Sequence, residues 1–126
     1  DEHAGGQLIS FDINPRAGWL VGEHPLWRMR VESTRQGLPG VLADSPPLGL
    51  FIHDSLHTYE NERFELTVAA QCLTAGGLLI SDNAHVTRAL EDTCKDFGYT
   101  YSEFRERPLR HFYPGGTLGA GRRGAD

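Results

Sequence analysis

The chain has 126 residues and a mass of 14.0 kDa, with 39% hydrophobic residues, 23% charged residues and a formal net charge of -5. This length fits one compact domain and is too short for two ordinary ones. The 17 acidic residues outnumber the 12 basic ones, which disfavours a protein that binds nucleic-acid phosphates. The apolar runs are too short to cross a bilayer, and the chain does not open on a secretion signal. Cys72 and Cys94 have no CxxC spacing and are typical of buried thiols in a reducing compartment. We therefore expect no nucleic-acid or membrane partner and a cytoplasmic location.

The first part of the chain predicts two strands and two short helices. Gln7–Ile13 is rich in apolar residues and follows a Gly-Gly pair, which predicts a buried strand. Ala17–Val21 can form a short helix after the break at Asn14-Pro15. Trp27–Val31 alternates apolar and basic residues and predicts a second strand. Thr34–Ala43 predicts a weak helix, because it contains two glycines and a proline.

The middle of the chain predicts a strand, a helix and a further strand. Leu48–His53 is an apolar run that predicts a strand. Thr58 can cap a helix that carries acidic residues in its first turn and apolar residues at helical spacing after it. Ala75-Gly76-Gly77 is expected to end this helix. Leu78–Ile80 is then a short apolar strand of the kind found inside parallel sheets.

The last part predicts one more helix and two closing strands. The helix runs over Val86–Phe97 and ends at Gly98, a residue that favours the left-handed conformation of a helix end. Tyr99–Phe104 and Thr117–Gly121 are expected to form an antiparallel pair. Strands that alternate with helices predict an α/β fold with a mostly parallel sheet, covered by helices on both faces.

Acidic residues stand at three of the predicted strand ends, where ligands bind in such sheets. Asp12 ends the first strand, Asp54 follows the third, and the Asp82-Asn83 pair follows the fourth. An acid at such a place can accept hydrogen bonds from ribose hydroxyls. Asp54, Asp82 and Asn83 are oxygen donors suited to Mg²⁺, Mn²⁺ or Ca²⁺ rather than to zinc. Neighbouring strands lie about 4.8 Å apart, so such residues can share one cation. The alternative interpretation is that these side chains only cap the helices that follow.

Three segments carry a resemblance to a known family. Residues 48–60, with the sequence LGLFIHDSLHTYE, resemble the fourth-strand motif of the class I S-adenosylmethionine (SAM)-dependent methyltransferases. Residues 75–83, with the sequence AGGLLISDN, are similar to the fifth-strand motif of that family. Ser10-Phe11-Asp12 resembles the second-strand motif, whose acid binds the cosubstrate ribose. The resemblance implies a Rossmann-like methyltransferase sheet and SAM as the cosubstrate.

The same resemblance implies a set of site residues. Metal-dependent O-methyltransferases of the catechol type hold Mg²⁺ with an Asp at the first of these motifs and an Asp-Asn pair at the second. Asp54, Asp82 and Asn83 match those ligands one by one. This match implies O-methylation of a small-molecule hydroxyl, assisted by a divalent cation. It also implies that Asp12, Ser33 and Asp54 take part in binding the cosubstrate, with Ser33 near the adenine.

The histidines near these motifs depart from the catechol-type pattern. His57 stands where those enzymes place a catalytic lysine. A histidine with an ordinary pKa of about 6.5 can act as a base at neutral pH, so His57 is the candidate catalytic residue. It can equally be a histidine that only makes local hydrogen bonds at a helix start. His85 is a candidate for lining the acceptor site or a plain surface residue. The His53-Asp54 pair resembles a metal-phosphohydrolase motif, but the strand-rich pattern argues against that mainly helical fold.

The glycine-rich loop of the family is missing before Gln7, together with the strand and helix that flank it. In the family that strand lies between those that match Gln7–Ile13 and Leu48–His53, so we expect both to have an unpaired inner edge. We therefore expect residues 1–126 to be a single partial domain from a longer protein. The rival hypothesis is a catalytically inactive Rossmann-like fragment that acts as an interaction module. A metal-free methyltransferase, the identity of the acceptor and homo-oligomer formation stay open.

Overall fold

The computed structural model describes residues 5–125, so the two ends of the predicted domain, residues 1–4 and 126, lie outside the described residues. Six strands and three helices follow one another within the described part. In chain order they are β1 (Leu8–Asp12), β2 (Trp27–Val31), α1 (Thr34–Ala43), β3 (Leu48–His53), α2 (Tyr59–Cys72), β4 (Leu73–Asp82), α3 (Ala89–Phe97), β5 (Thr100–Arg105) and β6 (Thr117–Arg122). This confirms the predicted α/β class. None of the described helices combines the length and the apolarity that a bilayer-spanning segment needs.

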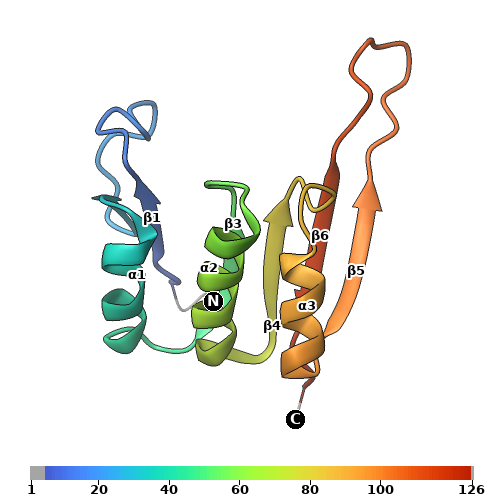
Figure 1. Cartoon of the computed structure of the whole chain (residues 1–126). Helices are drawn as coiled ribbons and strands as arrows, with labels where there is room; N and C mark the ends of the chain where they lie inside the picture. Colours follow the sequence, from blue (N-terminus) through green and yellow to red (C-terminus); the bar gives the residue numbers. More distant parts are fainter. Residues whose placement is uncertain (1–4, 126) are drawn as a thin grey trace.

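The strands form two separate sheets rather than one (Figure 1). One sheet is the parallel pair of β1 and β2, and the other has the order β3-β4-β6-β5. In the larger sheet β3 and β4 are parallel, and β6 runs antiparallel to both β4 and β5, so the closing strands pair as predicted. Among the described strands β1 and β3 do not pair with each other. Within residues 5–125 the inner edges of β1 and β3 are therefore unpaired, as expected.

The helices cover one face of the sheets only. Figure 1 shows α1, α2 and α3 on the same side of the strands. On the opposite face the side chains of Ile52 and Leu78 are 58% and 36% exposed, whereas Leu79, which alternates toward the helices, is fully buried. The expectation of helices on both faces was therefore wrong for the described residues. The predicted helix at Ala17–Val21 is replaced by turns, so the connection from β1 to β2 adds no helix to the second face.

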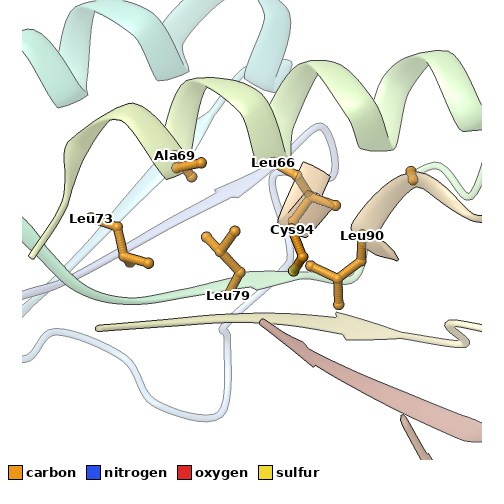
Figure 2. Packing of buried hydrophobic residues seen from close by; sticks show 8 residues of the cluster. Leu66, Ala69, Leu73, Leu79, Leu90 and Cys94 are labelled. Carbon is orange, nitrogen blue, oxygen red and sulfur yellow. The ribbon is translucent and has the colours of Figure 1, made fainter. Parts of the chain in front are cut away.

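The core lies between the helices and the larger sheet. Figure 2 shows Leu66 and Ala69 of α2, Leu73 and Leu79 of β4, and Leu90 and Cys94 of α3 packed against one another. All of them are buried. Burial raises the pKa of the Cys94 thiol to about 11, so this thiol is protonated at neutral pH. Both Cys94 and Cys72 are free thiols.

The helix ends follow local signals in the sequence, with small shifts in their bounds. Thr58 caps α2 and accepts a hydrogen bond from the backbone N–H of Asn61. Gly98 ends α3 in the left-handed conformation with φ 68°, as predicted. The helix α2 ends at Cys72 and passes directly into β4, which is longer than the predicted three-residue strand. The strand continues through the Gly-Gly pair because β4 pairs with β3 on one side and with β6 on the other.

Close packing between α3 and β6 predicts a large effect of a small substitution. A Cβ at Gly121 would lie 2.4 Å from Sγ of Cys94 and 3.4 Å from Cδ1 of Leu90. We expect Gly121→Ala to lower the free energy of unfolding by about 1–3 kcal/mol, because the extra methyl group overpacks the core. Urea unfolding measures this change. Gly124→Ala is the matched control, since its Cβ would meet nothing within 4 Å. Equal stability of the two variants would contradict the prediction.

Candidate functional site

Three of the predicted site residues come together at the carboxyl ends of β3 and β4. The two strands are parallel neighbours, and His53 lies opposite Ser81 in their register. Asp54, which follows β3, and Asp82, the last residue of β4, therefore lie at the same edge of the sheet. His57 follows in the loop before α2. One ligand atom from each of Asp54, His57 and Asp82 lies within 4.8 Å of the other two.

His57 lies beside the Asp54 carboxylate. Its Nε2 is 3.5 Å from Oδ1 of Asp54. The His57 side chain is 26% exposed, whereas that of Asp54 is 67% exposed, so the group is open to solvent on the Asp54 side. The Nδ1 atom of His57 is buried and has no hydrogen-bond partner among the described residues. The site thus combines a solvent-exposed carboxylate with an imidazole that lies beside it and is less exposed.

Asn83 contacts this group of three residues by a hydrogen bond to Asp82. Its Nδ2 donates a hydrogen bond of 2.8 Å to Oδ2 of Asp82. Asn83 has a φ of 51°, in the left-handed region that asparagine tolerates better than most residues. This conformation folds the Asn83 side chain back onto its neighbour. Asn83 therefore orients one oxygen of Asp82, and its predicted role as a metal ligand stays a prediction.

The two residues predicted to bind the cosubstrate ribose and adenine lie outside the larger sheet, Asp12 at the end of β1 and Ser33 at the start of α1. Asp12 is the last residue of β1, is exposed, and accepts a hydrogen bond of 2.8 Å from the backbone N–H of Asn14. Ser33 stands at the N-cap of α1, and its hydroxyl donates to Oε1 of Gln36 at 3.1 Å. Neither belongs to the group formed by Asp54, His57 and Asp82. Their predicted contacts with the cosubstrate stay predictions.

Two other histidines, His85 and His53, are fixed by contacts with neighbouring side chains. His85 is tied to β6, because its backbone N–H donates to the Thr117 hydroxyl at 2.7 Å and its Nδ1 lies 2.6 Å from the same oxygen. His53 is fully buried, and its Nδ1 lies 2.6 Å from Oε2 of Glu65. The side chain of His53 therefore points into the core rather than toward the solvent-exposed Asp54. This geometry argues against the metal-phosphohydrolase interpretation of the His53-Asp54 pair.

Two buried carboxylates lie beneath the site, and the sequence pattern did not predict their burial. Glu62 and Glu65 of α2 are 1% and 2% exposed. The sequence predicts Glu62 only as a favourable charge in the first turn of this helix, and acidic residues on a helix are rarely buried. The spacing of the two glutamates indicates their burial, because positions 62, 65, 66 and 69 lie on one helical face. Leu66 and Ala69 of that face belong to the core. Burial raises the pKa of Glu65, but hydrogen bonds from His53, Thr34 and Ser55 outweigh it, so the net pKa is lowered.

A separate hollow lies at the start of β1 and β2. It has a volume of about 660 Å³. Its lining is mostly apolar and comprises Gly6, Gln7, Leu8, Ser10, Val21, His24, Leu26 and Trp27. None of the predicted catalytic, metal or cosubstrate residues is among them. This hollow is therefore distinct from the group at the ends of β3 and β4.

The group at the ends of β3 and β4 fits a divalent cation. Two carboxylates, with one imidazole beside them, lie within 4.8 Å of one another, and carboxylate oxygens are the donors that Mg²⁺ and Mn²⁺ accept in proteins. The open side at Asp54 leaves room for a further ligand, as a site that binds substrate requires. The same three residues also contain a base, His57, within reach of that open side. The arrangement can therefore bind an oxygen-bearing molecule and accept a proton from it.

Several solved structures are similar to this chain in fold. The chain matches a protein from Klebsiella pneumoniae described as an O-methyltransferase, with 15% identity and a TM-score of 0.68 over 95% of this chain and 63% of that one. It matches the N-methyltransferase NodS from Bradyrhizobium japonicum WM9, with 14% identity and a TM-score of 0.67 over 94% and 74% of the two chains. A structure of SMU.1697c from Streptococcus mutans in complex with SAH matches with 11% identity and a TM-score of 0.58, over 92% and 76%.

These likenesses in structure show the fold, and the sequence shows the family. The chain spans 63% of the length of the Klebsiella protein, so it is similar to a part of that protein. No curated protein sequence matches the chain. The sequence profile of a family described as a methyltransferase domain matches residues 1–84, which is two thirds of the 126 residues. The chain belongs to this methyltransferase domain family, whose fold the structure displays.

Proposed function

We propose that the natural protein that contains this chain is a SAM-dependent O-methyltransferase acting on a hydroxyl group of a small molecule. A divalent cation such as Mg²⁺ is held by Asp54, Asp82 and Asn83 in this proposal. The observation that carries it is the convergence of ligand atoms from Asp54, His57 and Asp82 within 4.8 Å at two neighbouring strand ends. Family membership and a neighbouring structure in complex with SAH support SAM as the cosubstrate.

The chemistry follows from the donor types at this edge. A cation held by Asp54, Asp82 and Asn83 would lower the pKa of an acceptor hydroxyl and fix its orientation. His57 takes the proton from that hydroxyl. The acceptor oxygen attacks the sulfonium methyl group in line, the carbon–sulfur bond breaks, and S-adenosylhomocysteine leaves. Asp12 holds the ribose hydroxyls, and Ser33 and Asp54 border the remainder of the cosubstrate.

The oxygen-rich donor set favours oxygen as the methyl acceptor. Relatives in fold include both an O-methyltransferase and an N-methyltransferase, so the fold alone does not select the acceptor atom. Asp54 and Asp82 are hard ligands, and the cation that they prefer binds oxygen in its remaining positions. The hydroxyl of a small molecule fits this preference. The site is open to solvent at Asp54, and such a molecule can approach from there.

A second candidate function is an interaction module without catalysis. The uncovered face of the sheets favours it, because Leu50, Ile52, Leu78 and Leu118 expose between 36% and 58% of their surface there. Contiguous exposed apolar surface is typical of a surface that another polypeptide covers. The unpaired edges of β1 and β3 add hydrogen-bonding groups to it.

Calorimetric titration of the natural full-length protein with SAM and with Mg²⁺ separates the two candidates. The methyltransferase proposal expects saturable SAM binding and a separate, saturable Mg²⁺ site that EDTA empties. The SAM affinity is expected to change little with the metal, because two of the three proposed cosubstrate residues, Asp12 and Ser33, do not belong to the metal-binding group and only Asp54 is shared. Absence of SAM binding would leave the interaction module as the function. SAM binding without any Mg²⁺ binding would support a methyltransferase and remove the cation from its mechanism.

A further inference from the structure

Two buried carboxylates on one face of α2 lie directly beneath the candidate site. Glu62 and Glu65 are three residues apart, so they share a helical face, and both are almost fully buried. A buried carboxylate costs several kcal/mol unless hydrogen bonds and charges compensate it. Apolar side chains at these two positions would avoid that cost. The hydrogen-bond partners of the two carboxylates indicate their role.

Glu65 joins two segments that carry candidate site residues. Its Oε1 accepts hydrogen bonds from the hydroxyls of Thr34 at 2.5 Å and Ser55 at 2.8 Å. Its Oε2 accepts one from Nδ1 of His53 at 2.6 Å. Thr34 follows Ser33, and His53 and Ser55 flank Asp54. One carboxylate thus ties the start of α1 to the residues on both sides of Asp54, which follows β3.

Glu62 ties the end of β4 to the loop that precedes α3 in a similar way. Its Oε1 accepts a hydrogen bond of 2.5 Å from the hydroxyl of Ser81, the residue before Asp82. Its Oε2 accepts one of 2.6 Å from Thr87, in the loop that leads to α3. The Asp82-Asn83 pair lies between these two anchors. Bonds to a charged acceptor are stronger than neutral ones, so both anchors restrain this loop.

The buried network also reaches His57. The Nε2 atom of His53 lies 3.9 Å from Oε2 of Glu62, so the His53 ring lies between the two carboxylates but is hydrogen-bonded only to Glu65. This Nε2 is fully buried and has no hydrogen-bond partner among the described residues, like Nδ1 of His57. The two rings meet edge to face with centroids 5.3 Å apart. The ring of His57 therefore rests on a ring that the carboxylates hold in place.

We propose that Glu62 and Glu65 are positioning residues of the site. The hydrogen bonds of these two carboxylates with His53 and four hydroxyl groups are here called the clamp. The clamp fixes the ends of β3 and β4, and it holds Asp54, His57 and Asp82 at the spacing that a cation requires. The clamp itself rests on contacts in the structure, and only its benefit for cation binding rests on the proposed function. Neither glutamate touches the cation or the reactants. Each acts through the residues next to the ligands.

Hydrogen exchange of the backbone amides tests the clamp directly. Glu65→Gln keeps the shape of the side chain and removes its charge, and we expect roughly tenfold faster exchange in residues 34–36 and 54–58. Glu62→Gln is expected to have the same effect in residues 82–88. Both variants should leave β5 and β6 unchanged. Glu60→Gln is the matched control, because Glu60 lies in the same helix but is exposed. Uniformly faster exchange, or none, would overturn the proposal.

Single-hydroxyl variants cover the case in which a glutamine variant does not fold. Ser55→Ala removes one partner of Glu65, and Thr87→Ala removes one partner of Glu62. Each is expected to loosen only its own loop, residues 54–58 for the first and 84–88 for the second. If each loosens both loops equally, or neither, the two carboxylates are not separate anchors and the proposal is wrong.

Binding of Mn²⁺, followed by electron paramagnetic resonance, gives a readout that a purely structural role would not move. The Glu62→Gln and Glu65→Gln variants are expected to bind Mn²⁺ roughly tenfold more weakly than the wild type, because second-sphere contacts orient metal ligands. Glu60→Gln should bind as the wild type does. Unchanged Mn²⁺ affinity with loosened loops would refute the benefit for cation binding. A wild type that binds no Mn²⁺ would refute the proposed cation, while the exchange pattern still decides on the clamp.

Discussion

Replacing Asp82 with alanine is expected to abolish Mg²⁺-stimulated methyl transfer by the natural full-length protein, with a loss of at least about 100-fold in turnover. Asp82 supplies one of the two carboxylates of the group at the strand ends, and Asn83 hydrogen-bonds to it. Loss of a metal ligand removes a contribution of several kcal/mol to the stabilisation of the transition state. The affinity for SAM should stay close to that of the wild type. Steady-state rates at several Mg²⁺ concentrations, together with SAM titrations, measure both quantities.

The control for this substitution is Asp44→Ala. Asp44 is an exposed acid at the C-cap of α1, so its removal changes the net charge equally without touching the site. Its turnover should equal that of the wild type. Full activity of the untreated protein in the presence of EDTA would show that methyl transfer proceeds without the metal.

Replacing His57 with glutamine is expected to lower kcat by about 10²- to 10⁴-fold, the usual contribution of a general base. Glutamine keeps hydrogen-bonding capacity beside Asp54 but cannot take up the proton of the acceptor. The KM for SAM and the affinity for Mg²⁺ should change little, since two carboxylates and Asn83 remain as ligands. Steady-state kinetics and metal titration of the same variant measure these parameters.

The outcome of the metal titration distinguishes two roles for His57. Its Nε2 is part of the group within 4.8 Å, so it has the position of a ligand as well as that of a base. A collapse of Mg²⁺ affinity in His57→Gln would identify it as a ligand and contradict its role as the base. His111→Gln is the control, because His111 lies in the exposed loop between β5 and β6. It should leave both kcat and metal affinity unchanged.

Much of the fold could be predicted from short-range patterns. The strand Trp27–Val31 and the helix Thr34–Ala43 have the predicted bounds, since alternation and helical spacing are local properties. Thr58 and Gly98 end their helices as expected because capping involves only a few neighbouring residues. The start of β4 was misplaced because its extension through Gly76 and Gly77 depends on pairing with distant strands.

The candidate site shows the same division. Asp54 and Asp82 could be predicted as neighbours because each follows a strand and the two strands are adjacent in a parallel sheet. The role of Glu62 and Glu65 could not, since acidic residues on a helix usually face water. Their burial depends on partners from α1, β3, β4 and two loops, which no local pattern reveals.

The amino-acid sequence alone was sufficient for the α/β class, the order of the elements, the resemblance to SAM-dependent methyltransferases and the placement of oxygen donors at strand ends. These features depend on periodicity and on motifs of a few residues. Only the tertiary structure decided that the strands form two sheets with one uncovered face, that His57 joins the two aspartates, and that buried glutamates hold the strand ends. Such features depend on contacts between segments far apart in the chain, and the free energy of those contacts is set by burial and pairing.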